Sequence, residues 1–232
     1  MFSPCPCGHS RLPRFLCCKK PLLAAAKPRH LLIVRECLPL QQCRELVDYL
    51  QSRSGKALGV MDSSNTTDES VAVMQTSDRV TSALDGDGIQ EQLDEILVNL
   101  CTNIIPRHFS GSVQWYERPK VLSYETGGLY AKHADSEQFD EQNKRWNRVL
   151  DRDVSVIAYL NDDFVGGQLD FHFFGYTYTP RAGDVVLFPS DHRYVHEATK
   201  VTAGHRLAVV SWVALRGTPR IRPEPPAHAR LL

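Results

Sequence analysis

The sequence predicts a mainly β domain, a sandwich or barrel with two helices packed outside it. From Val113 onward, short runs of β-forming residues are separated by Gly, Pro or Asp, which is typical of strands joined by turns. Before this region, two segments repeat apolar residues at intervals of three and four positions, the spacing of one helix face. The sequence shows no internal repeat.

Length and charge exclude several classes of protein. The 232 residues are 42% hydrophobic and 23% charged, enough to bury a core without disulfide support. The 27 basic and 27 acidic residues give a net charge of +0, so no overall field attracts nucleic acid or an anionic membrane, and we expect no direct nucleic-acid patch. No run of about 18 apolar residues is present, so we expect no membrane span.

Cysteine usage indicates a cytoplasmic protein. The chain has seven cysteines, an odd number, and four of them fall within the first 18 residues. Clustered thiols without a paired framework indicate a reducing compartment. Pro4, Pro6 and Pro13 interrupt any apolar run near the N-terminus, so we expect no secretory signal.

The composition divides the chain into three segments. Residues 1–28 are rich in Cys, Pro and basic residues, and the composition changes at Pro28, before the apolar run Leu31–Val34. Residues 29–216 carry the helix and strand patterns. Residues 217–232 contain four prolines, which predicts a disordered proline-rich tail.

Two helices are predicted in the first half of the domain. Apolar residues between Leu38 and Leu50 share one helix face. A second helix is predicted from Ile89 to Ile104, with Asp87 as its cap and Pro106 as its stop. The polar segment Ser52–Ser70 between them is expected to be a mobile loop.

Strands are predicted along the rest of the chain, with the charged insertion Ser136–Leu150 between two of them. The predicted strands are Lys120–Tyr124, Leu129–His133, Val154–Leu160, Gln168–Phe171, Tyr176–Thr179, Asp184–Phe188 and Arg206–Val213.

One pair of residues suggests a metal site. His133 and Asp135 leave the same face of a strand, about 7 Å apart along the chain. They are two thirds of a facial triad, which binds Fe(II) and leaves positions open for substrates. His196, after an apolar strand and a turn, is the best third ligand, and His192 is the alternative on spacing alone. Arg206, ten residues beyond His196, can bind a carboxylate with two hydrogen bonds.

Further motifs stand around this pair in a characteristic order. They are Tyr124-Glu-Thr-Gly-Gly-Leu-Tyr130, His133-Ala-Asp135, Tyr159-Leu-Asn161, Gly166-Gly167-Gln-Leu-Asp-Phe171, Ala182-Gly183-Asp184, Phe188-Pro189-Ser190, His196-Glu197, Gly204-His-Arg206 and Trp212. Over roughly Lys120 to Val213, this set resembles the Fe(II)- and 2-oxoglutarate-dependent dioxygenases, particularly the prolyl 4-hydroxylase-like group.

The resemblance implies a double-stranded β-helix, or jelly roll, with iron at its mouth. His133, Asp135 and His196 would bind Fe(II), and Arg206 with Tyr159 would bind the distal carboxylate of 2-oxoglutarate. Tyr124 would line the same pocket. The resemblance also implies molecular oxygen as co-substrate and allows for ascorbate as an accessory reductant. We expect Gly166 and Gly167 to be turn residues without a chemical role.

The first 28 residues suggest a zinc site. Cys5, Cys7, Cys17 and Cys18 offer four soft ligands in a short segment, enough to close a tetrahedral zinc site. The pattern is similar to the SEC-C zinc motif, although nine residues separate Cys7 from Cys17. This resemblance implies docking to the translation or secretion machinery. The alternatives are an unstructured leader and an organelle presequence.

The leading functional hypothesis is an oxygenase that hydroxylates a prolyl residue in a protein or peptide substrate. The alternative keeps the chemistry but takes a free amino acid or another small molecule as substrate. A third hypothesis is a non-catalytic jelly-roll binding module. Fold analogy alone does not decide the substrate.

Overall fold

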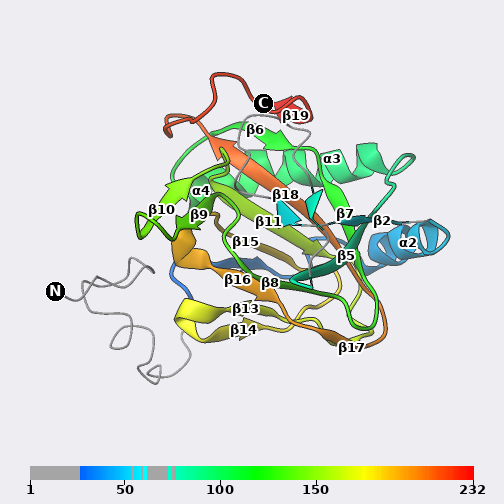
Figure 1. Cartoon of the computed structure of the whole chain (residues 1–232). Coiled ribbons are helices and arrows are strands. Elements are labelled where there is room, and N and C mark those ends of the chain that lie inside the picture. Colours follow the sequence, from blue (N-terminus) through cyan, green and yellow to red (C-terminus); the bar gives the residue numbers. More distant parts are fainter. Residues whose placement is uncertain (1–26, 54, 59, 62–72, 75–76) are drawn as a thin grey trace.

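The computed structural model describes residues 27–53, 55–58, 60–61, 73–74 and 77–232, which form a curled antiparallel sheet with helices on its outer side (Figure 1). Neighbouring strands follow the order β1-β15-β11-β18-β7-β5-β8-β16-β13-β14. The sheet thus curls from one layer, around β11 and β18, into a second layer, around β16 and β13. The predicted jelly-roll class is confirmed.

The strands have the following bounds. They are β1 (Leu32–Val34), β2 (Gly55–Leu58), β3 (Val60–Met61), β4 (Val73–Met74), β5 (Arg79–Leu84), β6 (Val113–Glu117), β7 (Lys120–Tyr124), β8 (Leu129–His133), β9 (Glu137–Asp140), β10 (Arg145–Arg148), β11 (Val154–Tyr159), β12 (Val165–Gly166), β13 (Leu169–Phe171), β14 (Tyr176–Tyr178), β15 (Val185–Pro189), β16 (His196–Ala198), β17 (Val201–Ala203), β18 (Arg206–Leu215) and β19 (Ala229–Leu231).

The alternation of side chains along the central strands creates two cores. In β18, Leu207 and Val209 point toward the helices, whereas Ala208 and Val210 point into the barrel. In β11 the same rule sends Tyr159 into the barrel. Since both faces of these strands are covered, they are apolar almost throughout. The inner face is the one that carries the polar residues of the site.

The helices cover the outer face of the sheet. Helix α2 (Leu40–Gln51) and helix α3 (Gln90–Asn99) bury their apolar faces in the same core as β11, β15 and β18. A π-helical turn η1 (Leu100–Ile104) and helix α4 (Ile105–His108) continue α3.

Two details of the second predicted helix are wrong. Pro106 does not end the helical segment, because it lies in the first turn of α4, where its missing N–H group is tolerated. Asp87 is not the cap: Ile89 occupies that position, since Gly88 forms a turn with φ 88° between them.

Segments without a predicted strand also pair. The insertion Ser136–Leu150 forms the hairpin of β9 and β10, and β2 pairs with β5 inside the segment predicted as a mobile loop. Residues 62–70 of that loop lie outside the described residues. Short 3₁₀ turns η2 (His172–Phe174) and η3 (His192–Tyr194) precede β14 and β16.

The predicted disorder of residues 217–232 is wrong. Strand β19 pairs with β6, and Asp151 and Asp153 bind the start of this segment through the backbone of Ile221 and the side chain of Arg220. These carboxylates supply the anchoring that a proline-rich sequence lacks by itself. We call residues 217–232 the C-terminal strap.

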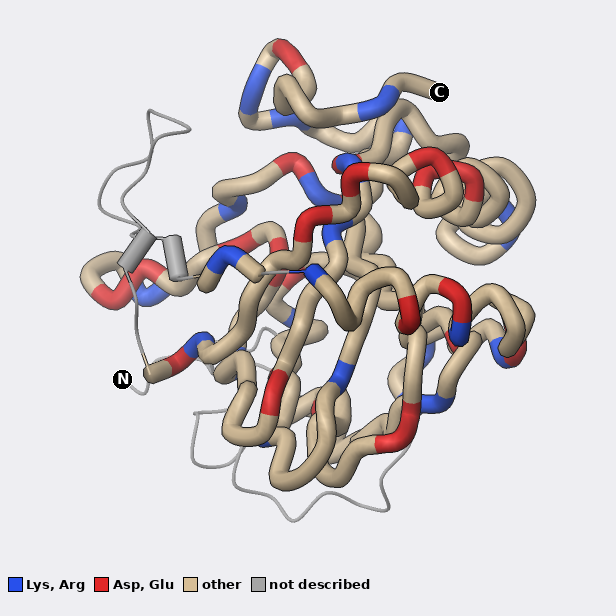
Figure 2. The backbone as a smooth tube through the Cα atoms, turned by 90° about the vertical axis from the view of Figure 1, so that its right-hand side faces the viewer, with Lys and Arg blue, Asp and Glu red and all other residues tan. Residues whose placement is uncertain are grey.

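Basic and acidic residues are both scattered along the tube in the view of Figure 2. Among the described residues, no helix is long and apolar enough to cross a membrane.

Candidate active site

Two neighbouring strands bring the predicted triad together. His133 ends β8, and its partner across the antiparallel pair is His196, the first residue of β16. Asp135 follows two residues after His133. The ligand atoms of the three side chains all lie within 4.8 Å of one another. His192 does not join them. It lies in η3, the 3₁₀ turn that precedes β16.

The imidazoles present the same ring nitrogen to the carboxylate. Nδ1 of His133 donates to the carbonyl of Ala131 (2.8 Å), and Nδ1 of His196 donates to the carbonyl of Tyr194 (3.0 Å). This leaves each Nε2 atom 3.6 Å from an oxygen of Asp135. Imidazoles whose second nitrogen is held by a carbonyl are typical metal ligands.

Charge and burial keep this site in its metal-binding form. Burial would raise the pKa of Asp135, but the neighbouring His196 and His133 and a hydrogen bond from Ser155 hold it far below its ordinary value. Burial, together with the charge of His133, lowers the pKa of His196 to about 4. At neutral pH the carboxylate is therefore ionised and His196 is neutral, the forms that bind a divalent cation.

A serine pair supports the carboxylate from inside the barrel. The hydroxyl of Ser155 donates to Asp135 (2.6 Å) and lies 2.7 Å from the hydroxyl of Ser190. The sequence analysis missed Ser155, although its position in β11, four residues before Tyr159 on the same face, was the available signal.

Arg206 and Tyr124 line the same pocket, and Tyr159 packs beside Arg206 in the inner core. The guanidinium carbon of Arg206 lies 4.5 Å from the ring centre of Tyr124 and 5.2 Å from that of Tyr159. Arg206 is 2% exposed and Tyr159 is fully buried. The Nε and Nη1 atoms of Arg206 and the hydroxyl of Tyr159 have no hydrogen-bond partner among the described residues.

Buried polar atoms without partners are costly unless a ligand completes them. Arg206 lines the same pocket as His133, Asp135, His196 and Trp212, so its atoms and the triad border one cavity. A dicarboxylate that reaches from the triad to Arg206 would satisfy them, so the residues fit Fe(II) together with 2-oxoglutarate.

Gly167 makes room for this arginine. It is buried with φ +60°, and a Cβ atom built on it would lie 3.1 Å from Cδ of Arg206. The interpretation of Gly167 as a turn residue alone is therefore too narrow.

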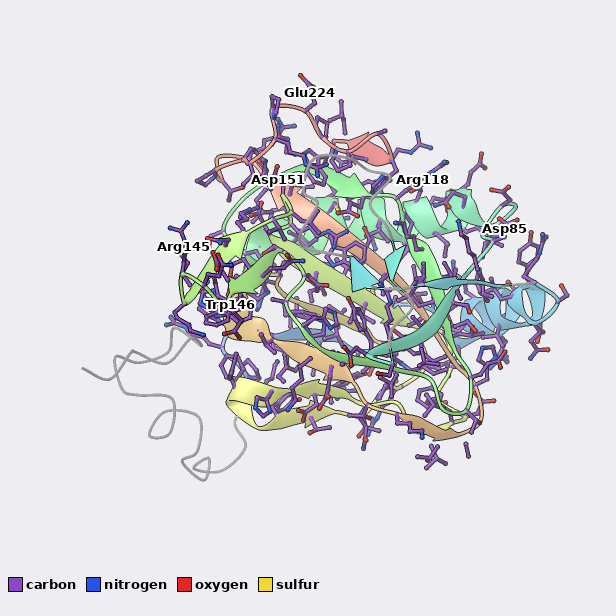
Figure 3. The ribbon with its side chains drawn as sticks, viewed as in Figure 1. Asp85, Arg118, Arg145, Trp146, Asp151 and Glu224 are labelled. Atoms are coloured by element: carbon purple, nitrogen blue, oxygen red, sulfur yellow. The ribbon has the colours of Figure 1, made fainter. Side chains whose placement is uncertain are left out.

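A hairpin is attached to the turn that precedes His196. The ring of Trp146 in β10 stacks on His192 at 5.3 Å and 14°, and His192 also binds Glu137 in β9. Trp146 is on the side of the hairpin next to the start of β16 (Figure 3). His192 thus ties the hairpin to the turn that leads to His196.

A second group of residues that the sequence analysis missed lies behind Asp135. Arg152 donates to the backbone carbonyl of Asp135 (3.3 Å), and its guanidinium lies 3.6 Å from the ring centre of Trp212. Glu117 pairs with Arg152 through both oxygens. No pattern in the sequence pointed to this pair, because the two residues are 35 positions apart.

The cysteine segment cannot be placed in this site. Cys5, Cys7, Cys17 and Cys18 lie outside the described residues.

Fold and site together define a jelly-roll protein with two histidines, one aspartate and a buried arginine in a single pocket. Residues 119–214 match the family described as the 2OG-Fe(II) oxygenase superfamily, so this chain contains a 2OG-Fe(II) oxygenase domain.

Curated relatives and solved structures agree with this domain. A PKHD-type hydroxylase of Psychrobacter sp. (strain PRwf-1) is 29% identical over 53% of this chain and 49% of its own length. Prolyl 3-hydroxylase 2 of Rattus norvegicus is 34% identical over 36% of this chain and 13% of its own length. This chain therefore spans about half of the first relative and a small part of the second.

The viral collagen prolyl hydroxylase of Paramecium Bursaria Chlorella virus-1, in complex with 2OG, shares the fold. It superposes with a TM-score of 0.56 at 14% identity, covering 81% of this chain and 97% of the viral one.

Proposed function

We propose that this protein is an Fe(II)- and 2-oxoglutarate-dependent oxygenase that hydroxylates a prolyl residue in a protein or peptide substrate. The observation that carries the proposal is one pocket lined by both the triad and Arg206, whose buried Nε and Nη1 atoms have no hydrogen-bond partner among the described residues. The matching domain supports the oxygenase class, and relatives named as prolyl hydroxylases support the substrate.

The chain's own residues supply binding, orientation and exclusion of water. His133, Asp135 and His196 would hold the metal, and Ser155 would keep the Asp135 carboxylate in place. Arg206 would bind the distal carboxylate of 2-oxoglutarate with its planar fork, with the hydroxyl of Tyr159 as a further donor. When bound, iron, 2-oxoglutarate and molecular oxygen supply the oxidising chemistry, with ascorbate as an accessory reductant.

Burial of this pocket strengthens the interaction with a dianion. Arg206 and Tyr159 lie among apolar neighbours such as Leu122, Ile157 and Ala208. A charge-assisted hydrogen bond is stronger where water is excluded. Burial also raises the pKa of Tyr159, which keeps its hydroxyl protonated as a donor.

The first test is formation of succinate from 2-oxoglutarate by protein loaded anaerobically with iron, with proline-containing peptides present and absent. In Arg206→Lys we expect a loss of 2-oxoglutarate affinity of about tenfold to a hundredfold, because a lysine cannot make the two-pronged contact. Arg118→Lys is the matched control, since Arg118 is an exposed arginine outside the pocket (Figure 3).

The outcomes separate the hypotheses. Turnover in the wild type that depends on Arg206 and rises with a prolyl peptide supports the proposal. Turnover that responds only to free amino acids moves the substrate to a small molecule. Binding of metal and 2-oxoglutarate without turnover, even with a broad protein extract, overturns the enzymatic proposal.

We further propose that Cys5, Cys7, Cys17 and Cys18 bind zinc in a docking segment and that the protein works in the cytoplasm. The spacing of the four cysteines supports the first point. The free thiols of Cys37, Cys43 and Cys101 support the second. Zinc content equal in the wild type and in the variant with all four replaced by serine would overturn the zinc site.

A further inference from the structure

We propose that the C-terminal strap is part of the active-site scaffold and that His228 is a positioning residue. It acts through Glu117 and Arg152 on the Asp135 turn and on the Trp212 wall of the pocket. This inference rests on the proposed function, because it assigns a role toward the metal that the triad would hold.

The connection begins at the strap. The Nε2 atom of His228 lies 3.2 Å from Oε2 of Glu117, the last residue of β6. Beside it, the backbone N–H of Arg118 donates to the carbonyl of His228 (3.1 Å), and Ala229 is the partner of Glu117 in the β19–β6 pair. The strap thus reaches Glu117 through both side chain and backbone.

Glu117 in turn binds Arg152. The carboxylate accepts from Nε of Arg152 with one oxygen and from Nη2 with the other (2.8 Å). Glu117 is 3% exposed in its side chain and Arg152 is 15% exposed. A bidentate pair of this kind fixes the plane of the guanidinium as well as its position.

Arg152 then contacts the site in two directions. Its remaining nitrogen, Nη1, donates to the backbone carbonyl of Asp135 at 3.3 Å. Its flat face lies over Trp212, which lines the pocket. Because Glu117 holds the plane of the guanidinium, both contacts depend on the same carboxylate.

The charges agree with this order of contacts. Burial alone would raise the pKa of Glu117, but the charge of Arg152 and hydrogen bonds from His228 and Arg152 lower it to about 2. The carboxylate is thus ionised, and Arg152 and His228 both contact its Oε2 atom. Removal of either donor changes the interaction that orients the other.

The strap has further anchors that do not pass through Glu117. Asp153 accepts from Thr218 (2.7 Å) and Arg220 (3.0 Å), and Asp151 accepts from the backbone of Ile221 (2.9 Å). Asp151 lies between the strap and the hairpin, below the bend that carries Glu224 (Figure 3). Loss of the His228 side chain therefore leaves the strap attached, so its effect on the site can be measured in folded protein.

The test compares affinity for Mn(II), measured by titration calorimetry on the full chain, in four variants. We expect the affinity of His228→Ala for Mn(II) to fall about threefold, which corresponds to the loss of one hydrogen bond. His228→Gln, whose amide can still donate to Glu117, retains the wild-type affinity. The affinity of Arg152→Lys for Mn(II) falls about tenfold, as is usual when a residue that orients a metal ligand is changed. Arg230→Ala, two residues beyond His228 and beside Asp94, is the control, and its affinity for Mn(II) stays unchanged.

A double variant makes the test sharper. If His228 acts only through Arg152, His228→Ala adds no loss in the Arg152→Lys background. Wild-type affinity in His228→Ala, an equal loss in Arg230→Ala, or full additivity in the double variant would each overturn the inference. Failure of the proposed function would be seen separately, as absence of 2-oxoglutarate turnover in a wild type that binds Mn(II).

Discussion

The guanidinium of Arg206 has room in the barrel because position 167 is a glycine. The backbone of Gly167 has φ +60°, and a Cβ atom there would lie 3.0 Å from the ring of Phe164 and 3.1 Å from both Arg206 and Val201. Two separate requirements, a left-handed backbone and close packing, therefore meet at one residue. The second requirement links this turn to the binding of a dicarboxylate.

Gly167→Ala is expected to lower both stability and affinity for 2-oxoglutarate. The left-handed backbone costs about 1–2 kcal/mol with a Cβ atom, and the displaced Arg206 weakens binding further. Gly127→Ala is the control, because Gly127 has φ +95° but no atom within 4 Å of a built Cβ. Urea unfolding should show a loss in both variants, and calorimetry a loss of 2-oxoglutarate affinity only in Gly167→Ala. Equal 2-oxoglutarate affinities in the two variants would contradict the packing argument.

The hairpin of β9 and β10 is attached to the site by few contacts. It pairs only with itself in the described part of the chain, and the main links toward the triad are Trp146 on His192 and Glu137 to His192. A two-stranded hairpin is marginal by itself, so these side chains, together with Arg148 of β10 bound to Asp153, hold it in place. The insertion in the sequence is thus joined to the turn that leads to His196.

Trp146→Ala should release this hairpin. Loss of the stacked ring removes much of the apolar contact that holds β10, so amide hydrogen exchange in residues 137–148 should become faster. Arg145→Ala is the matched control, since Arg145 is the exposed neighbour on the same strand. We expect 2-oxoglutarate affinity to be retained, because Arg206 is in a different layer. Unchanged exchange in Trp146→Ala would show that other contacts hold the hairpin.

The whole molecule is stabilised by two apolar cores and by ion pairs around Glu117, at the end of β6. Glu117 joins β6, the loop before β11 and the C-terminal strap through Arg152 and His228. A carboxylate whose pKa is lower in the folded state stabilises the fold above its unfolded pKa. That contribution disappears as the pH falls from 4.5 toward 2.

Glu117→Gln should therefore flatten the acid side of the stability profile. In the wild type, Glu117 contributes about 3 kcal/mol to the free energy of unfolding at neutral pH. Urea unfolding at about pH 5.5 and about pH 3 should show a smaller difference between the two conditions in Glu117→Gln. The variant is also less stable at neutral pH, because Arg152 loses its partner. An acid dependence equal to that of the wild type would contradict this assignment.

Much of the fold could be predicted because the strand and helix patterns are visible in the local sequence. Strands β7 and β8 match their predicted bounds, since residues such as Val121 and Leu129 follow a period that local sterics impose. The proline-rich strap and the hairpin could not be predicted in this way. Their order comes from partners such as Asp153 and His192, which are distant in sequence.

By itself the sequence determined the class of the domain and pointed to the residues that we propose carry its chemistry. His133 and Asp135 are spaced for one face of a strand, and Arg206 starts another, so local periodicity already orients them. Only the tertiary structure decided that His196 rather than His192 meets them. It also placed Ser155, Arg152 and Glu117 behind Asp135. The physical reason is that pairing register and buried ion pairs join positions that no local pattern connects.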